Sequence, residues 1–439
     1  MSGADTGARS PERADPGSGH GPSHESGPWA ARAELAELAV RHRHLRPLWL
    51  LPGTLLGVCG WPATPAQRVF GPWNYWWQAQ VLDCLVDAYV RSPDPKRRAR
   101  VSRFVNGMRR RNGRGWLNDY YDDMAWLALA LQRAERQVGV RRPGAVSGLA
   151  GALRGGWTQD AGGGIWWRTR EKYGEDFKNV PTNGPAAILF ARLRDRRAYA
   201  TAQWIERHLV DQNSGVVWDG LHVAKDGGIR EIETMRHTYC QGVYLGACLE
   251  LASWGDDGES AAWAERAART VEAVMAHLTV PSDAEPDKPS KPSKPSKPDK
   301  PYKFYEPANS GTGAGDADGG ALSPPMPRST PQVLKGGGGG DGGLFAGILA
   351  RYLAQAALTL PDFGPGFAHT AYQAAKVVFD SARAAWDHRA PGPGGPVFGH
   401  EWSNPADPPR RRGPERDLSV QTGAWMLFEA AALLARSAP

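Results

Sequence analysis

The sequence predicts an all-helical domain built as an (α/α)6 barrel, in which six inner helices are wrapped by six outer ones. Three observations predict it. Apolar residues recur almost throughout at the helical period of 3.6, alternating strand patterns are scarce, and two kinds of helix alternate along the chain. One kind has a single apolar stripe, whereas the other is apolar nearly all round and must be buried on every side. With 439 residues, 41% of them hydrophobic, the chain is long enough to build one such domain around a large core.

Twelve segments follow the helical period. The segment 258–279 shows the amphipathic kind, because Trp263, Val271 and Leu278 fall on one stripe. The residues from Met124 to Leu131 show the buried kind, since none of them is polar. The predicted helices are, in order, 31–46, 72–91, 95–111, 120–137, 144–154, 182–194, 197–210, 236–254, 258–279, 341–358, 366–388 and 418–436. Those predicted for the inner ring are 72–91, 120–137, 182–194, 236–254, 341–358 and 418–436, which alternate with the outer ones.

Five predicted inner helices have a polar residue directly before the apolar run: Gln78, Asp123, Asn183, Gln241 and Gln421. Helix N-termini also carry spare backbone donors and a partial positive charge. If these ends gather on one face of the barrel, they form a cleft with a polar floor. For any single one of these residues, ordinary helix capping is an equally good interpretation.

Three segments interrupt the helical pattern. Residues 156–181 and 213–233 contain glycines and tryptophans and are expected to form short hairpins or long loops, which at this size are usually functional. Residues 281–340 contain Lys-Pro-Ser repeats and end in a run of five glycines, so we expect a disordered insertion. Because the helical pattern resumes after it, residues 29–439 are interpreted as one domain behind a disordered tail, 1–28.

The net charge of +7 comes from one stretch, since Lys96 to Arg114 contains nine Lys or Arg and no acidic residue. Its apolar positions recur at helical spacing, which favours an exposed helix with a solvated basic face. Contact with an anionic partner, such as a phospholipid or a phosphoglycan, is the alternative. Nucleic acid is disfavoured because no nucleic-acid-binding motif lies nearby.

The four cysteines, Cys59, Cys84, Cys240 and Cys248, lie far apart in apolar surroundings, as expected of buried thiols in a reducing compartment. The N-terminal residues show no export signal, and the apolar run from Leu48 to Trp61 is cut by proline and glycine, so no membrane span is predicted. These observations predict a cytoplasmic protein. No metal or cofactor site is predicted.

The strongest local feature is the segment from Asn118 to Trp126, in which Asp122 and Asp123 are adjacent at the start of an otherwise apolar helix. Retaining glycosidases need two carboxyl groups about 5 Å apart, one as nucleophile and one as acid/base, and adjacent residues can span that distance. Helix capping remains an alternative explanation for the pair. The neighbouring tyrosines and the 18 tryptophans of the chain favour a sugar site, because flat aromatic faces stack on sugar rings.

Other chemistries fit less well. An isoprenoid cyclase would need a third aspartate of a DDxxD motif at position 126, where this chain has Trp126. His400 and Glu401 are not part of an HExxH zinc motif, and no phosphate-binding glycine loop follows a strand. Cys240 and Cys248 lack the setting of a nucleophile and are expected to be core residues.

The residues Tyr121 to Ala130, YDDMAWLALA, resemble the hallmark of glycoside hydrolase family 76, the endo-acting α-1,6-mannanases. Further segments resemble family motifs and follow in the family's order: Tyr75 to Ala79 (YWWQA), Gly163 to Trp167 (GGIWW), Lys178 to Gly184 (KNVPTNG), Thr238 to Gly242 (TYCQG) and Ser419 to Thr422 (SVQT). Together they cover roughly residues 72 to 436. The ordered series is far more specific than any one motif.

The resemblance implies an (α/α)6 barrel that hydrolyses α-1,6-mannosidic linkages of mannan-type polysaccharide or lipoglycan with retention of configuration, without metal or cofactor. By the same resemblance, Asp122 is the nucleophile and Asp123 the acid/base. It also implies stacking or hydroxyl partners for sugar at Tyr120, Tyr121, Trp166, Trp167 and Tyr239, and hydrogen-bond partners at Asn183 and Gln241; inner-ring packing is the alternative role for these seven.

The sequence departs from the family in three features. The family is usually secreted, whereas no export signal is seen in this chain. The family's segment before the fifth inner helix is replaced in this chain by a glycine-rich run and the Lys-Pro-Ser insertion. The basic helix at 96–114 has no counterpart in the family. Two other functions stay open at this point: a non-catalytic mannan-binding or scaffold protein on the same barrel, and another (α/α)6 enzyme such as an epimerase or an unsaturated uronyl hydrolase. An epimerase would need a central histidine pair, whereas His237 is the only histidine on the predicted inner helices.

Overall fold

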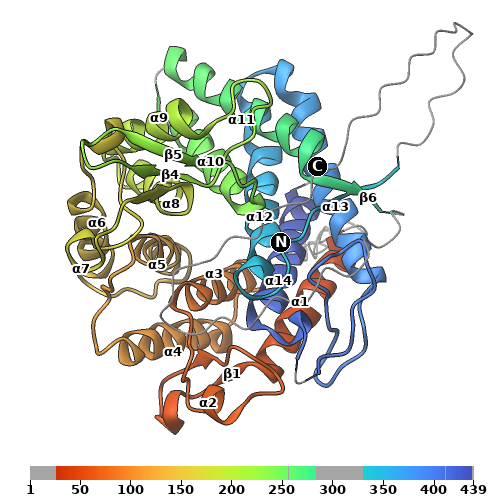
Figure 1. The fold of residues 1–439 in the computed structure, drawn as a ribbon. Coiled ribbons are helices and arrows are strands. Elements are labelled where there is room, and N and C mark those ends of the chain that lie inside the picture. Colours follow the sequence, from red (N-terminus) through yellow and green to blue (C-terminus); the bar gives the residue numbers. More distant parts are fainter. Residues whose placement is uncertain (1–25, 256, 283–329, 411, 438–439) are drawn as a thin grey trace, which may run out of the picture.

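The computed structural model describes residues 26–255, 257–282, 330–410 and 412–437. Twelve helices of eleven residues or more lie in this part of the chain, and they are the twelve predicted segments. The inner ring consists of α3 (Tyr75–Arg91), α5 (Tyr121–Arg133), α8 (Val180–Arg192), α10 (Thr238–Ala252), α12 (Phe345–Thr359) and α14 (Leu418–Ser437). The outer helices are α1 (Ser26–Arg43), α4 (Pro95–Arg111), α6 (Ala145–Gly155), α9 (Arg197–Leu209), α11 (Asp257–His277) and α13 (Ala368–Asp387). The protein is thus an (α/α)6 barrel, as predicted (Figure 1).

The inner ring closes on itself. Each inner helix packs against the next one in the chain, and α14 packs back against α3. Each outer helix packs against the inner helix before it, except α1, which packs against α14 and so completes the outer ring from the other end of the chain. An outer helix therefore returns the chain to the end of the barrel where the next inner helix begins. All six inner N-termini meet at that end.

Small residues allow the inner helices to approach one another closely. A Cβ on Gly347 of α12 would lie 2.5 Å from the Gly423 carbonyl oxygen of α14, and a Cβ on Gly184 of α8 would lie 2.4 Å from Val243 of α10. No side chain fits at such distances. These glycines are therefore required by the packing of one backbone against another.

Short strands lie in the segments that connect the helices of the barrel. In the described residues, β1 (Leu45–Arg46) pairs with β2 (Leu56–Gly57), and β6 (Thr279–Pro281) pairs with β7 (Gln332–Leu334). A three-stranded sheet consists of β3 (Phe177–Asn179), β4 (Gly220–Val223) and β5 (Ile229–Glu233). All of these pairs are antiparallel. Two single-turn helices, α2 (Pro65–Arg68) and α7 (Arg170–Tyr173), complete the set. The sheet of β3, β4 and β5 joins the two tryptophan-containing segments, 156–181 and 213–233, which the sequence predicts as hairpins or loops.

Several predicted boundaries differ from the observed ones. The first helix begins at Ser26 and not at 31, because proline is compatible with the first turn of a helix and Pro28 does not end it. Residues 26–28 of the predicted tail are therefore helical, while 1–25 lie outside the described residues. Helix α5 ends at Arg133 and continues as a π-helical turn, Ala134–Val138.

The predicted disordered insertion at 281–340 needs a correction at its second end. Residues 283–329 lie outside the described residues, but 330–344 have a defined structure. The segment enters through β7, which pairs with β6, and reaches α12 through a 3₁₀ helix, Gly340–Leu344. The glycine run is ordered because it packs tightly: a Cβ on Gly342 would lie 1.7 Å from the Gly337 carbonyl oxygen.

Two described helical stretches, Gly340–Phe363 and Leu418–Ser437, are long and apolar enough to cross a membrane by length and composition. Of their apolar windows, 67% and 94% are buried inside the fold. Both belong to the inner ring, whose apolar surface is covered by neighbouring helices.

The four cysteines are buried and unpaired, and Cys240 and Cys248 are core residues as predicted.

Candidate active site

The first turn of α5 carries the adjacent carboxylates Asp122 and Asp123, at the end of the barrel where the inner helices begin. The Trp167 indole N–H donates to Asp122 Oδ2 at 3.0 Å, and the Asp123 backbone N–H donates to Asp122 Oδ1 at 2.8 Å. The Asn118 side-chain amide donates to Asp123 Oδ2 at 2.6 Å. The cap position itself is held by Tyr120, which makes no side-chain capping bond. Both carboxylates are half-buried.

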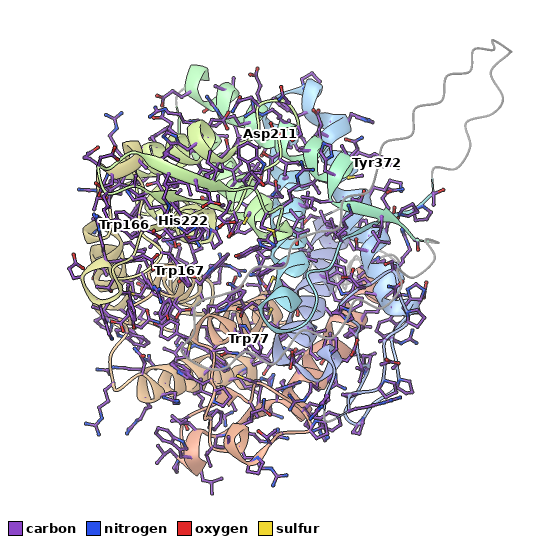
Figure 2. The ribbon with its side chains drawn as sticks, viewed as in Figure 1. Trp77, Trp166, Trp167, Asp211, His222 and Tyr372 are labelled. Carbon is purple, nitrogen blue, oxygen red and sulfur yellow. The ribbon has the colours of Figure 1, made fainter. Side chains whose placement is uncertain are left out.

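The glycine-tryptophan segment is tied to the start of α5 through its backbone. The Tyr121 N–H donates to the Trp167 carbonyl at 2.9 Å, and the Thr169 N–H donates to the Asp119 carbonyl at 2.8 Å. On its other side the segment pairs with β3, because the Trp167 N–H donates to the Phe177 carbonyl at 2.9 Å. Trp167 is thereby held between the helix start and the sheet. Figure 2 labels it on the same side of the molecule as Trp166 and His222. Its indole is fixed in position for Asp122.

A third carboxylate, Asp341, belongs to the site and was missed by the sequence analysis. It lies in the 3₁₀ helix before α12, where its Oδ1 accepts the indole N–H groups of Trp76 at 3.0 Å and of Trp77 at 2.6 Å (Trp77 is labelled in Figure 2). It acts electrostatically on both Asp122 and Asp123. The signal in the sequence is one acidic residue within a glycine run, and the low complexity of that run concealed it.

Aromatic side chains from four inner helices surround these carboxylates. Trp76 of α3 lies 6.2 Å from Trp126 of α5, 6.3 Å from Tyr239 of α10 and 6.4 Å from Phe345 of α12, measured between ring centroids. Tyr239 and Phe345 stack in parallel at 3.9 Å. Tyr120 contacts Trp167 edge-on at 5.5 Å. The site is a cluster of carboxylates with aromatic walls, which is suited to a ligand having both hydroxyl groups and apolar C–H faces.

The surroundings raise the pKa values of both carboxyl groups of α5. Burial raises the pKa of Asp122 to about 7, although the N–H donors of Asp123 and Trp167 work against this shift. Burial, followed by the charge of Asp122, raises the pKa of Asp123 well above its ordinary value. Asp341 raises both pKa values further. Both carboxyl groups therefore hold a proton to higher pH than a solvent-exposed aspartate does.

The other predicted sugar-binding residues separate into two groups. Tyr120, Tyr121, Trp167 and Tyr239 are half-buried around the carboxylates. Trp166 is only 2% exposed and lies under Lys178 and Arg170, whose charged groups are 4.5 and 4.7 Å from its ring centroids. The structure thus contradicts the prediction that Trp166 stacks on sugar, because no face of its ring is open.

Asn183 and Gln241 are also wrongly predicted as sugar ligands, since both are fully buried and bonded to the backbone. Asn183 accepts the Ile165 N–H at 2.8 Å and donates to the carbonyls of Ile165 and Asn179 at 3.0 and 2.9 Å. Gln241 accepts the Val217 N–H at 2.8 Å and donates to the carbonyls of Val217 and His237 at 2.7 and 3.1 Å.

The same arrangement recurs at two other inner helices. Gln78 of α3 binds both backbone groups of Gly57 and the Trp73 carbonyl, and Gln421 of α14 binds both backbone groups of Phe398 and the Glu415 carbonyl. The amides predicted to floor the cleft therefore neither cap their helices nor face a ligand. We call them amide clamps, since each one holds a preceding loop against its helix start.

Lys178 anchors the glycine-tryptophan segment from below. It is fully buried, and its ammonium donates to Thr158 Oγ1 at 3.0 Å and to the carbonyls of Asp160 and Gly163 at 2.7 and 2.6 Å. Burial lowers the pKa of this ammonium to about 7. Its role is to hold the loop that carries Trp167.

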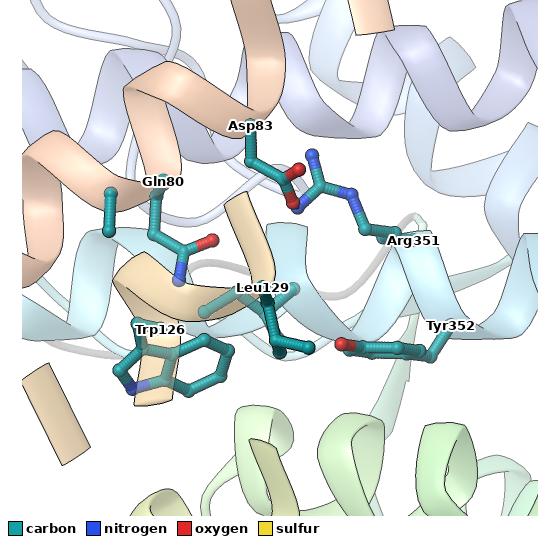
Figure 3. Close-up of a pocket in the computed structure, with 8 residues that line it drawn as sticks. Gln80, Asp83, Trp126, Leu129, Arg351 and Tyr352 are labelled. Atoms are coloured by element: carbon teal, nitrogen blue, oxygen red, sulfur yellow. The ribbon is translucent and has the colours of Figure 1, made fainter. Parts of the chain in front are cut away.

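Behind the site, a small cavity of about 10 Å³ opens among Gln80, Asp83, Trp126, Arg351 and other residues, which is room for a single water (Figure 3). Asp83 and Asp87 form salt bridges with Arg133 and Arg351. Within the described part of the chain, no group of three or more His, Cys, Asp or Glu is arranged to hold a metal ion.

Comparisons with known proteins agree with this geometry. The family model of glycosyl hydrolase family 76 matches residues 57–291. An inactive variant of the α-1,6-mannanase GH76A of Salegentibacter sp. HEL1_6, with two consecutive aspartates replaced by asparagine and with α-1,6-mannotriose bound, is similar over 92% of this chain and 99% of its own, with 27% identity and a TM-score of 0.67.

A family 76 mannosidase of Bacteroides thetaiotaomicron, Bt3792, has the same fold at 15% identity, with a TM-score of 0.64 over 93% of this chain and 99% of its own. No curated protein sequence matches the chain significantly. The family match covers more than half of the chain and contains the carboxylate pair of α5, and it confirms the resemblance noted in the sequence. The chain belongs to glycosyl hydrolase family 76 and is a glycoside hydrolase.

Proposed function

We propose that the protein hydrolyses α-1,6-mannosidic linkages of a mannan-type polysaccharide or lipoglycan with retention of configuration. The observation that carries the proposal is the pair Asp122 and Asp123 at the start of α5, two adjacent carboxyl groups held by different donors, Trp167 for Asp122 and Asn118 for Asp123. The choice of linkage is supported by the similar Salegentibacter enzyme, an α-1,6-mannanase bound to α-1,6-mannotriose in its inactive variant. The two replaced aspartates of that variant are adjacent, as are Asp122 and Asp123.

Asp122 is proposed as the nucleophile. Two N–H donors, from Trp167 and from the Asp123 backbone, stabilise its anionic form and fix its orientation. Its carboxylate attacks the anomeric carbon and forms a glycosyl ester, while the bond to the leaving oxygen breaks. The nucleophile must be ionised, and these two donors favour the ionised form of Asp122.

Asp123 is proposed as the acid/base. Burial and the charge of Asp122 raise its pKa and so favour its protonated form, and it gives this proton to the leaving oxygen. The deprotonated Asp123 then takes a proton from a water molecule, whose oxygen attacks the anomeric carbon and releases Asp122. Asn118 holds the Asp123 carboxyl in place during both steps.

The aromatic residues are proposed as sugar platforms. Trp76, Tyr239 and Phe345 extend around the carboxylates from three different helices, so consecutive mannose units can contact them across the end of the barrel. Tyr120, Tyr121 and Trp167 line the side formed by the start of α5 and the loop packed on it.

An anionic glycolipid or phosphoglycan as carrier of the mannose chain is supported by the basic residues of α4, from Lys96 to Arg111. A cytoplasmic location is supported by four buried, unpaired thiols.

The test is incubation with linear α-1,6-mannooligosaccharides, with products separated by size and the anomer formed first identified by NMR. We expect cleavage with the α anomer appearing first. Asp122→Asn and Asp123→Asn should each lower kcat by about 10³-fold or more, because the two groups act as a unit. Asp362→Asn, which changes an exposed carboxylate far along the chain, should retain full activity.

Three outcomes would overturn the proposal. A first product in the β configuration would mean inversion, and unchanged turnover in Asp122→Asn would remove the assigned nucleophile. Binding of the oligosaccharides without cleavage by the native protein would mean that the linkage is wrong.

A further inference from the structure

A loop before α2 exposes an apolar tip on the outside of the barrel. Trp49 is 51% exposed and Leu50 is 87% exposed, and Val69 beside them is 60% exposed. The Trp49 indole N–H donates to the Val69 carbonyl at 3.0 Å, so the two segments form one surface. Leu51 adds a fourth, partly exposed apolar side chain. Large apolar side chains gathered in this way on a surface indicate an interaction site.

The backbone of this tip is strained. Trp49 and Leu50 have φ values of 47° and 61°, in the left-handed region that bulky residues avoid. The tip is nevertheless held in place, since the Leu55 N–H donates to the Arg103 carbonyl at 3.0 Å and Asn106 donates to the Gly53 carbonyl at 3.1 Å. A strained conformation that presents two apolar side chains to solvent gives nothing to the core and is expected only where those side chains are used.

Arginines surround the tip. Arg46, Arg68, Arg103 and Arg110 are exposed, and the Arg111 guanidinium lies 5.9 Å from the Trp49 ring centroid while donating to the Phe70 carbonyl. None of these five forms a salt bridge with an acidic residue in the described ranges. By contrast, Arg97 and Arg100 at the other end of α4 are paired with Glu37, and Arg97 also with Glu34 and Asp94. In the described residues, Arg103, Arg110 and Arg111 of α4 therefore have no acidic partner, whereas Arg97 and Arg100 do.

The patch adjoins the catalytic end of the barrel. The last turn of α4, with Arg109, Arg110 and Arg111, leads directly to the loop that carries Asn118. In that loop the Asn112 side chain donates to the Leu117 carbonyl at 2.9 Å, and Leu117 is 54% exposed. Figure 1 shows β1, α2 and α4 together at one side of the molecule.

We propose that this patch, Trp49, Leu50, Leu51 and Val69 with Arg46, Arg68, Arg103, Arg110 and Arg111, docks the enzyme on an anionic lipid bilayer. Tryptophan and leucine insert at the interface of a bilayer, and arginines around them bind the anionic headgroups. A nucleic acid would meet the arginines but would leave the leucines unused. The inference goes beyond the proposed glycan specificity and does not depend on it. Docking here would place the edge of the active site, at Asn118, toward the lipid surface.

The test is sedimentation of the full-length protein with phosphatidylcholine vesicles, with and without about one third phosphatidylglycerol. We expect binding to the anionic vesicles to be at least about tenfold stronger, and to weaken with salt. The double variants Trp49→Ser/Leu50→Ser and Arg103→Gln/Arg110→Gln should each reduce binding about tenfold. Both should keep the thermal stability of the native protein and its activity on soluble oligosaccharides.

Matched controls change the same chemistry elsewhere on the surface. Leu358→Ser/Tyr372→Ser removes exposed apolar side chains near α13, and Arg207→Gln/Lys225→Gln removes two exposed charges; neither should alter vesicle binding. Equal binding by patch and control variants would overturn the proposal. So would binding that depends on the arginines but not on Trp49 and Leu50, or that inorganic phosphate abolishes, because either result describes an anion site and not bilayer docking.

Discussion

At the scale of single residues, Trp167 controls the charge on Asp122. Its indole N–H donates to Asp122 Oδ2 and favours the ionised carboxylate. We predict that Trp167→Phe, which keeps an aromatic ring and removes the donor, raises the pKa of Asp122. The acidic limb of the pH profile of kcat/KM should then move upward by about one unit, since the loss of one charge-assisted hydrogen bond has that size.

Trp166→Phe is the matched control for this change. Trp166 precedes Trp167 directly, but its Nε1 has no hydrogen-bond partner among the described residues. The variant should leave the acidic limb in place even if a smaller ring lowers stability. An equal shift in both variants would show that the effect comes from packing and not from the hydrogen bond.

Asp341 acts in the opposite direction, because its negative charge raises the pKa values of both Asp122 and Asp123. We predict that Asp341→Asn moves both limbs of the kcat/KM profile to lower pH. The neutral amide oxygen can still accept from Trp76 and Trp77, so the two rings should keep their places. Kinetics measured across the pH range check this. A downward shift of only one limb would mean that Asp341 acts on one carboxylate alone.

At the scale of elements, the amide clamps decide how the loops join the inner ring. Each amide hydrogen-bonds to both the N–H and the carbonyl of a buried loop residue, where water would otherwise be needed. Gln241, for example, binds both backbone groups of Val217. We predict that Gln241→Leu lowers the free energy of unfolding by about 2–4 kcal/mol, because it leaves a buried N–H and two carbonyls without partners. Chemical unfolding measures this. Activity per folded molecule should change much less.

Gln132→Leu is the comparison for the clamp. Gln132 is buried on α5, and neither end of its amide has a hydrogen-bond partner among the described residues. The apolar replacement should therefore be neutral or stabilising. A loss of stability equal to that of Gln241→Leu would mean that side-chain volume, and not hydrogen bonding, explains both results.

At the scale of the whole molecule, the half-buried carboxyl groups of α5 lower the stability of the fold. An aspartate whose pKa is raised in the folded protein binds more protons folded than unfolded, so stability falls as pH rises from its unfolded pKa of 3.8 to its folded value. For Asp122 that window ends at about pH 7. We predict that Asp122→Asn matches the native protein in stability near pH 4 and exceeds it by about 1–2 kcal/mol above pH 7, allowing for partial solvent exposure.

Thermal unfolding of both proteins between pH 4 and 8 checks the prediction. The difference should grow with pH through the window and then level off. A difference that is constant with pH would mean that the substitution acts through packing. A native protein more stable than the variant at pH 8 would contradict the raised pKa.

Much of the architecture was predictable from the sequence. The helical period and the alternation of wholly apolar with amphipathic segments predicted all twelve helices and their assignment to two rings. This was possible because a helix that is buried on every side is apolar nearly all round, whereas an outer helix has one apolar face. The Asp122 and Asp123 pair was visible for the same reason: two carboxylates stand out directly before an apolar run from Met124 to Leu131.

The tertiary structure alone decided which polar residues face the site. Gln78, Asn183, Gln241 and Gln421 looked like a cleft floor, yet each pairs with a loop distant in sequence, and such a partner leaves no local pattern. Asp341 directly follows a glycine run that was predicted to be disordered, yet close packing of glycine backbones orders the run and brings the Asp341 carboxylate to the tryptophans of α3. The sequence pattern predicts which side chains are buried. Which hydrogen-bond partners the buried polar groups find depends on how the helices pack when the ring closes.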